Sequence, residues 1–202
     1  MTSSTDVVVH GFETSNNMKV RVALGYKSIP YTFRTIEPAD RDEVFRISGQ
    51  YLTPVLVHGD RVVFDSAAIL RYLDFAFRET PRLFGGSHRE QWEIEDWELF
   101  ARTALANPMM EIVHKRVYGG GVDDALIGRC TTAFGEAATK LADRLQGREW
   151  LVGDRMTAAD ITAAAVLFRV RAAELFGGAA AAVAPLTAWT DRVMAFDNKC
   201  RR

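Results

Sequence analysis

Hydroxyl and amide side chains gather in residues 10–20, with the sequence HGFETSNNMKV, directly after the short apolar run DVVV. Thr14, Ser15 and Asn16 can all donate hydrogen bonds. None of them is a nucleophile without a general base, and the only imidazole in this stretch is that of His10. The same residue types are also the favoured N-caps of helices. The stretch is therefore either a capped strand-to-helix loop or a site whose side chains act as hydrogen-bond donors.

Two residue pairs further along the chain have the same double character. Asp65-Ser66 follows the apolar run RVVF and precedes a helical pattern, so Ser66 is expected to cap a helix whose free N–H groups could bind a carboxylate. Asp65 would also interact favourably with the helix dipole. Thr53-Pro54 opens the run VLVH, and proline is tolerated at the start of a strand. Local sequence alone explains both pairs as structural.

The elements that would position these residues form an α/β unit. Residues 6–10 are predicted as a strand, residues 17–26 as a helix, and IPYTFRTI as a second strand parallel to the first. A short polar helix or coil is expected over residues 38–47. TPVLVHGDRVVFDS is a hairpin that turns at Gly59-Asp60, and SAAILRYLDFAF is a helix. The order β-α-β-α-β-β-α predicts a four-stranded mixed sheet.

The rest of the chain is predicted to be helical. RETPRLFGG, residues 78–86, contains one proline and two glycines and resembles a linker. We therefore expect one domain over residues 1–78, a linker over 79–87 and an all-helical domain over 88–202. Thr157 and Asp160 in MTAADI form a pattern typical of a capping box. GGAAAAVAP, residues 177–185, is expected to be a loop between helices.

Composition excludes several functional classes. The chain has 202 residues, is 48% hydrophobic and 25% charged, and carries a formal net charge of −1. Such a chain can bury a core, and it has no global field that would favour nucleic acid or an anionic membrane. No stretch reaches ~18 uninterrupted apolar residues, and the N-terminus MTSSTD lacks the features of a signal peptide. Two cysteines and four histidines show no metal-type spacing. We expect a cytoplasmic protein without a metal.

Three stretches together resemble the cytosolic glutathione transferases. LTPVLVHGDRVVFDSAAILRYL is similar to the family's stretch around its cis-proline, hairpin and acidic-Ser turn. WLVGDRMTAADI resembles its buried capping box, and MKVRVALGYKSIPY resembles its first helix and second strand. The resemblance spans nearly the whole chain. It implies a thioredoxin-like domain that binds glutathione, followed by an all-α helical bundle.

The resemblance also implies roles for the pairs described above. Asp65 would accept hydrogen bonds from the ammonium of the γ-glutamyl group, and the helix start at Ser66 would bind its carboxylate. The Thr53-Pro54 bond would be cis, which would turn the Thr53 backbone toward the peptide ligand. The family often has a glycine three residues before this proline, whereas this chain has Tyr51 there.

In the family, the residue that activates the thiol lies between the first strand and the first helix. Counting back five residues from Lys19 gives Thr14 as the expected hydroxyl donor, with Asn16 as a second donor and Ser15 as a further candidate. The pattern T-x-N-x-x-K-V resembles the Nu-like bacterial transferases, which often reduce disulfides with glutathione. Because position 14 is not a cysteine, the ligand's own sulfur would be the nucleophile.

The resemblance therefore predicts a glutathione transferase that attacks a small hydrophobic electrophile or a disulfide. Candidate walls for that second substrate are aromatic and methionine residues of the helical half: Trp97, Phe100, Ala104, Met109 and Met110. A homodimer is implied, through the helix at 66–77 and the helix after the linker. The alternatives are a binding or interaction module without turnover, and a Zeta-type isomerase, whose Ser-Ser-Cys loop is absent here.

Overall fold

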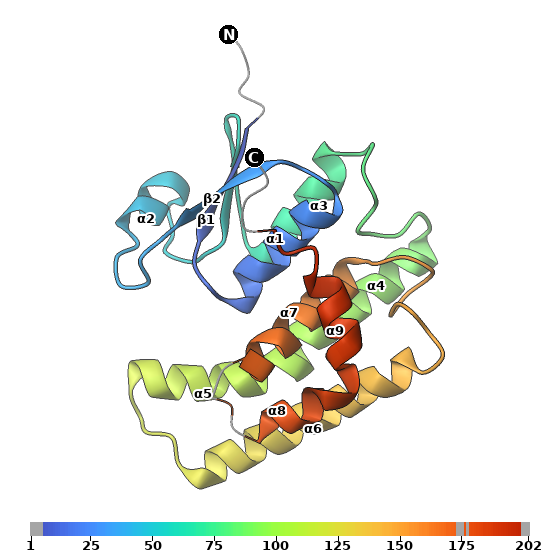
Figure 1. Cartoon of the computed structure of the whole chain (residues 1–202). Coiled ribbons are helices and arrows are strands. Elements are labelled where there is room, and N and C mark those ends of the chain that lie inside the picture. Colours follow the sequence, from blue (N-terminus) through green and yellow to red (C-terminus); the bar gives the residue numbers. More distant parts are fainter. Residues whose placement is uncertain (1–5, 173–175, 177, 199–202) are drawn as a thin grey trace. The chain divides into compact units, whose positions relative to one another are not determined.

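The computed structural model describes residues 6–172, 176 and 178–198, which fold into two compact units (Figure 1). The first unit contains residues 6–84 and also residues 195–198. The second unit contains Gly85–Met194. The sequence prediction placed residues 195–198 in the helical domain, and their contacts with the first unit explain the difference, as described below.

The first unit contains a four-stranded sheet in the order β2-β1-β3-β4. β1 pairs with β2 in parallel, β1 with β3 antiparallel, and β3 with β4 antiparallel, so the predicted mixed sheet is confirmed. The strands are β1 (Val7–Gly11), β2 (Tyr31–Thr35), β3 (Val55–His58) and β4 (Arg61–Phe64).

Three helices accompany this sheet: α1 (Ser15–Tyr26), α2 (Asp42–Ser48) and α3 (Ser66–Ala76). In Figure 1, α1 and α3 run side by side next to the sheet, and α2 lies on its other side. There Val44 of α2 packs with Ile36 and Val55 in a buried apolar cluster. The element order β-α-β-α-β-β-α matches the prediction, and α1 begins two residues earlier than expected.

Helix α1 is buried along most of its length, including two cationic side chains. Arg21 is fully buried and forms a bidentate pair with Asp197, with both nitrogen-to-oxygen distances at 2.7 Å. Tyr31 donates a hydrogen bond to the carbonyl oxygen of Asn198, and Tyr26 packs edge-on against Phe196. These contacts account for the position of residues 195–198 in the first unit.

The expected linker also packs on the first unit. Lys27, which is buried just beyond α1, donates to Asp74 at 2.8 Å and to the carbonyl oxygen of Pro81 at 2.9 Å. The Asp74 carboxylate then accepts the backbone N–H groups of Leu83 and Phe84. The segment between α3 and the next helix is therefore fixed by hydrogen bonds as far as Phe84.

The described residues of the second unit contain helices and no strand. In chain order these are α4 (His88–Phe100), a π-helix (Ala101–Leu105), α5 (Ala106–Tyr118), α6 (Asp124–Leu145), α7 (Ala158–Ala172), α8 (Ala179–Val183), a 3-10 helix (Ala184–Leu186) and α9 (Thr187–Met194). The π-helix joins α4 to α5 and ends three residues before Pro108, whose missing N–H cannot bond to the preceding turn. The prediction of a loop over residues 177–185 is wrong in part, because Ala179–Val183 is helical. The high alanine content of this segment favours a helix.

The predicted capping box lies at the start of α7. The Asp160 carboxylate accepts from the backbone N–H of Thr157 at 2.8 Å, from the Thr157 hydroxyl at 2.8 Å and from the backbone N–H of Leu151 at 2.9 Å. The Asp160 side chain thus reaches back to the backbone and the hydroxyl of Thr157, as a capping box predicts. Burial raises the pKa of Asp160 to about 6, although the hydrogen bonds from Leu151 and Thr157 oppose this shift.

Neither unit, as far as it is described, contains a helix long and apolar enough to cross a membrane. Over the same residues no group of three histidine, cysteine or acidic side chains is arranged to hold a metal ion.

Candidate functional site

The start of α1, the turn before β3 and the start of α3 meet in the first unit. The side-chain amide of Asn17 donates to the hydroxyl oxygen of Thr14 at 2.7 Å and to that of Thr53 at 3.1 Å. The hydroxyl of Ser66 donates to the amide oxygen of Asn16 at 3.2 Å. Two neighbouring amides therefore tie together three segments that are far apart in the sequence.

Thr14 is the N-cap of α1, with φ −132° and ψ 160°. Its hydroxyl oxygen accepts from the backbone N–H of Asn17 at 3.3 Å as well as from the Asn17 side chain. The side chain is half-buried. Capping uses the oxygen as an acceptor and leaves the hydroxyl proton for another partner. The two interpretations of this loop, helix capping and hydrogen-bond donation, are thus compatible.

The other two candidate residues of the loop differ in their surroundings. Ser15 is the first residue of α1 and is half-buried. Asn16 is exposed, and its amide oxygen accepts from Ser66 on α3. Its amide nitrogen has no partner among the described residues, so it can still donate. The proposed roles of Thr14, Asn16 and Ser15 stay predictions.

Asn17 is the residue that the sequence analysis missed. Its side chain is fully buried, and it sits directly against Gly11 at the end of β1. A Cβ atom on Gly11 would lie 1.6 Å from the amide oxygen of Asn17, so only glycine leaves room for this amide. The signal was present in the sequence as an amide three residues after an N-cap threonine. The T-x-N spacing of the loop indicates Asn16 instead.

The turn before β3 has the predicted cis peptide bond between Thr53 and Pro54. The residues before it form a closed loop, in which Gln50 donates to the hydroxyl of Ser48 and to the carbonyl of Leu52, both at 2.9 Å. Tyr51, which replaces the family's usual glycine, stacks on Phe45 with ring centroids 4.7 Å apart. The polar end of Gln50 is therefore used within its own loop.

At the start of α3 the N-cap lies one residue earlier than the sequence predicted. Asp65, not Ser66, is the N-cap, and its carboxylate accepts from the backbone N–H groups of Ala67 at 2.9 Å and Ala68 at 3.2 Å. Asp65 has φ 64°, which is rare for a residue other than glycine and turns the chain sharply into the helix. Ser66 is the first helical residue and is buried. The Asp65 carboxylate accepts from the N–H groups of Ala67 and Ala68 but not from that of Ser66, so the Ser66 N–H is the amide of the first turn that this side chain leaves uncapped.

His10 does not join this group. It is buried on β1, and its Nδ1 atom lies 3.4 Å from the Glu43 carboxylate on α2. Burial lowers the pKa of His10, with Glu43 acting in the opposite direction. The partner that the structure shows for His10 is thus Glu43 on α2 and not a hydroxyl of the loop.

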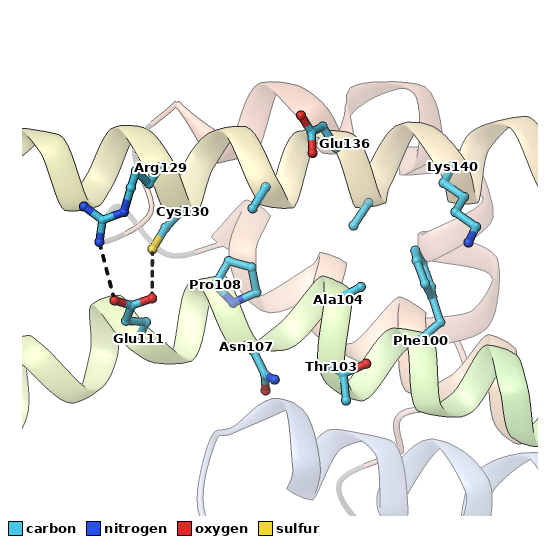
Figure 2. Close-up of a pocket in the computed structure, with 12 residues that line it drawn as sticks. Phe100, Thr103, Ala104, Asn107, Pro108, Glu111, Arg129, Cys130, Glu136 and Lys140 are labelled. Atoms are coloured by element: carbon cyan, nitrogen blue, oxygen red, sulfur yellow. Dashed lines mark hydrogen bonds and ion pairs between the residues drawn. The ribbon is translucent and has the colours of Figure 1, made fainter.

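The second unit contains a groove of about 650 Å³ between α6 and the segment from α4 to α5. Phe100 and Ala104, two of the predicted wall residues, line it. In Figure 2, Arg129 and Cys130 of α6 point toward Glu111 of α5. Burial and the nearby Glu111 carboxylate raise the pKa of the Cys130 thiol, which makes it a poor nucleophile.

The other three predicted wall residues lie outside the groove's lining. Trp97 packs edge-on against Phe100, with ring centroids 5.2 Å apart. Met109 is buried in the core of the second unit, and Met110 is exposed. Only two of the five predicted wall residues, Phe100 and Ala104, therefore line this groove.

The fold and the site define a class: a thioredoxin-like domain with a donor-rich start of its first helix, joined to an all-helical domain. Two family models match the chain, the N-terminal domain of glutathione S-transferase over residues 9–81 and the C-terminal domain of glutathione S-transferase over residues 109–197. The protein belongs to the glutathione S-transferase family.

Individual relatives agree with this membership. Glutathione S-transferase F10 of Arabidopsis thaliana is 30% identical over 54% of this chain and 53% of its own length. Elongation factor 1-gamma of Trypanosoma cruzi is 28% identical over 80% of this chain and 40% of its own length. The chain thus spans about half or less of these curated relatives. A solved glutathione S-transferase from Methylobacterium radiotolerans, in complex with glutathione sulfonate, shares the fold with a TM-score of 0.79 and 22% identity, over 98% of this chain and 97% of that one.

Proposed function

We propose that this protein is a glutathione transferase that binds glutathione in its first unit and activates the thiol of the ligand. The observation that carries the proposal is the Thr14 hydroxyl, which is held at the N-terminus of α1 by Asn17 and has a proton that meets no acceptor among the residues that the structure describes. The relative named glutathione S-transferase F10 and the solved relative in complex with glutathione sulfonate support glutathione as the ligand.

The γ-glutamyl end of glutathione would bind at the start of α3. The backbone N–H of Ser66 and the positive end of the helix dipole suit its carboxylate. The exposed Asp65 carboxylate suits its ammonium group, and the Thr53 backbone would pair with the peptide part of the ligand.

The thiol end would lie near the start of α1. A free thiol has a pKa of about 8.5, so only a few per cent is thiolate at neutral pH. A hydrogen bond to a charged group contributes about 1.5–3 kcal/mol, and one pKa unit corresponds to about 1.36 kcal/mol. A single donated bond from Thr14, present only for the thiolate, would therefore lower the thiol pKa by roughly one to two units. The proton that leaves the thiol passes to water.

The thiolate then attacks the second substrate. With an electrophile, a new carbon–sulfur bond forms and the leaving group departs with its electron pair. With a disulfide, the glutathione sulfur bonds to one sulfur while the other leaves as a thiolate and takes up a proton. We propose a small hydrophobic electrophile or a disulfide as this substrate, in a cytoplasmic detoxification role.

Equilibrium binding of glutathione, measured by titration calorimetry, tests the proposal. The protein should bind glutathione, and Asp65→Ala should weaken that binding by roughly tenfold or more, as expected for a lost charge-assisted hydrogen bond. Asp60→Ala, at an exposed aspartate in the β3–β4 turn, is the matched control and should bind like the wild type. Absence of binding at millimolar glutathione would refute the assignment.

The second candidate is a binding module without turnover. It is favoured by the relative named elongation factor 1-gamma, which matches 80% of the chain. Conjugation and disulfide-reduction assays run side by side separate the two candidates, because only an enzyme shows turnover that depends on glutathione.

A further inference from the structure

One buried amide contacts two hydroxyl groups, one at the N-cap of α1 and one in the turn before β3. The Asn17 amide nitrogen reaches Thr14 at 2.7 Å and Thr53 at 3.1 Å, so its two N–H bonds are both used. The side chain is fully buried, which shields these two hydrogen bonds from competition with water.

The hydroxyl of Thr14 has a fixed hydrogen-bond inventory. A hydroxyl carries one donor and two acceptor lone pairs. Both acceptor positions of Thr14 are taken, by the backbone N–H of Asn17 at 3.3 Å and by its side chain at 2.7 Å. Its proton has no acceptor among the described residues and must point away from Asn17. The Thr53 hydroxyl likewise accepts from Asn17, so its proton also points away from the amide.

This arrangement has a cost in stability. The amide oxygen of Asn17 is buried and has no hydrogen-bond partner in the described part of the chain. An unsatisfied buried polar atom costs about 1–3 kcal/mol, and an apolar residue at position 17 would avoid that cost. This oxygen also restricts position 11 to glycine, because a Cβ atom there would collide with it. Both features are explained if the amide nitrogen is needed.

We propose that Asn17 is a positioning residue that turns the hydroxyl protons of Thr14 and Thr53 toward the sulfur of bound glutathione. The inference rests on the proposed function. Asn17 itself does not touch the sulfur. By filling both acceptor positions of the Thr14 hydroxyl and one of the two on Thr53, it turns both hydroxyl protons away from the amide and favours their role as donors, and donors stabilise the thiolate over the thiol.

The test is the thiol pKa of glutathione in its complex with the protein, followed by the ultraviolet absorbance of the thiolate as a function of pH. In the wild type this pKa should lie below the value for free glutathione. Asn17→Ala should reduce the fraction of thiolate at neutral pH by roughly three- to tenfold, equivalent to about half to one pKa unit. Asn17→Ser, which is also too short to reach Thr53, should behave alike and serves if the alanine variant does not fold.

A double-mutant cycle identifies the route of the effect. In a Thr14→Val, Thr53→Val background, Asn17→Ala should leave the thiol pKa unchanged, because no hydroxyl remains for the amide to orient. Thr139→Val, which removes an exposed hydroxyl from α6, is the matched control and should leave the thiol pKa at its wild-type value.

The outcomes separate the inference from the proposed function. If the wild type fails to bind glutathione, or leaves its thiol pKa unchanged, the proposed function fails. If the wild type lowers the thiol pKa and the Asn17 variants lower it equally, the proposed function stands and the inference is wrong. An effect of Asn17→Ala that persists in the double-valine background also overturns the inference.

Discussion

At the scale of single residues, the proposed function gives Thr14 two tasks that use different parts of one hydroxyl group. The oxygen caps α1 by accepting from Asn17, and the proton has no acceptor within the described part of the chain. The sequence marked Thr14 as a candidate cap, because a threonine before a helical pattern is a favoured N-cap, and its donor role stays a prediction. It could not identify Asn17, because the meeting of this amide with Thr53 depends on strand β3 lying beside β1.

Replacing Thr14 separates the two tasks. Thr14→Val loses both the cap and the donor, so it should lower kcat/KM by roughly 10- to 100-fold, as expected for one lost hydrogen bond to a charge. Stability should fall by about 0.5–2 kcal/mol from the lost cap. Thr14→Ser keeps both groups and should stay close to wild type.

The informative variant is Thr14→Asp. Its carboxylate caps a helix well but repels a thiolate, so thermal stability should return while conjugation or disulfide reduction does not. Steady-state kinetics and thermal unfolding measure the two quantities on the same samples. A Thr14→Asp enzyme with full activity would show that the hydroxyl proton has no role in the chemistry.

At the scale of elements, helix α1 is fixed at its far end by buried charge. Burial alone would lower the pKa of Arg21, but its hydrogen bonds and ion pairs with Asp197 and Glu13 raise it above the usual value. This pair could not be predicted from the sequence, because Arg21 and Asp197 are 176 residues apart. An arginine between two valines in a helix is ordinarily expected to face solvent, whereas Arg21 is fully buried.

Breaking the pair should destabilise the first unit strongly. Asp197→Ala leaves a fully buried guanidinium without its main partner, which should reduce the free energy of unfolding by about 3–5 kcal/mol. Asp191→Ala removes a partly exposed partner of Arg171 and should cost about 1 kcal/mol or less. Urea unfolding of both variants provides the comparison, and equal effects would contradict the account of α1.

The capping box of α7 predicts a dependence of stability on pH. The pKa of Asp160 is raised from its ordinary value of 3.8 to about 6 in the folded protein. Between these values the folded state binds more protons than the unfolded state, so this group lowers the free energy of unfolding as pH rises. The expected contribution is about 3 kcal/mol, lost between pH 4 and pH 7.

Asp160→Asn removes this titration. From pH 4 to pH 7 the free energy of unfolding of the wild type should therefore fall relative to that of the variant, whichever of the two is the more stable. Denaturant unfolding at several pH values measures it. A difference that is independent of pH would show that Asp160 keeps an ordinary pKa.

At the scale of the whole molecule, the sequence predicted the sheet, its strand order along the chain and the helical second unit. These depend on local periodicity and turn residues, which a sequence displays directly. The π-helix before Pro108, the groove beside α6 and the return of residues 195–198 to the first unit depend on packing between distant segments. No local pattern encodes them.

The proposed homodimer is a prediction at this scale. Large apolar side chains are exposed on the two helices expected at the interface, Phe75 on α3 at 67% and Trp92 on α4 at 68%. The mass in solution, measured by light scattering, should be twice 22.5 kDa. Phe75→Glu should shift it toward the monomer. Val117→Glu, at a side chain 65% exposed on α5, should not, and a monomeric wild type would contradict the prediction.

The most direct test of the central claim is a crystal structure of the protein with glutathione bound. Thr14 should lie within hydrogen-bonding distance of the ligand's sulfur, with the γ-glutamyl carboxylate at the start of α3 near Ser66. A sulfur atom that contacts a different side chain, with the Thr14 hydroxyl turned away from it, would contradict the account.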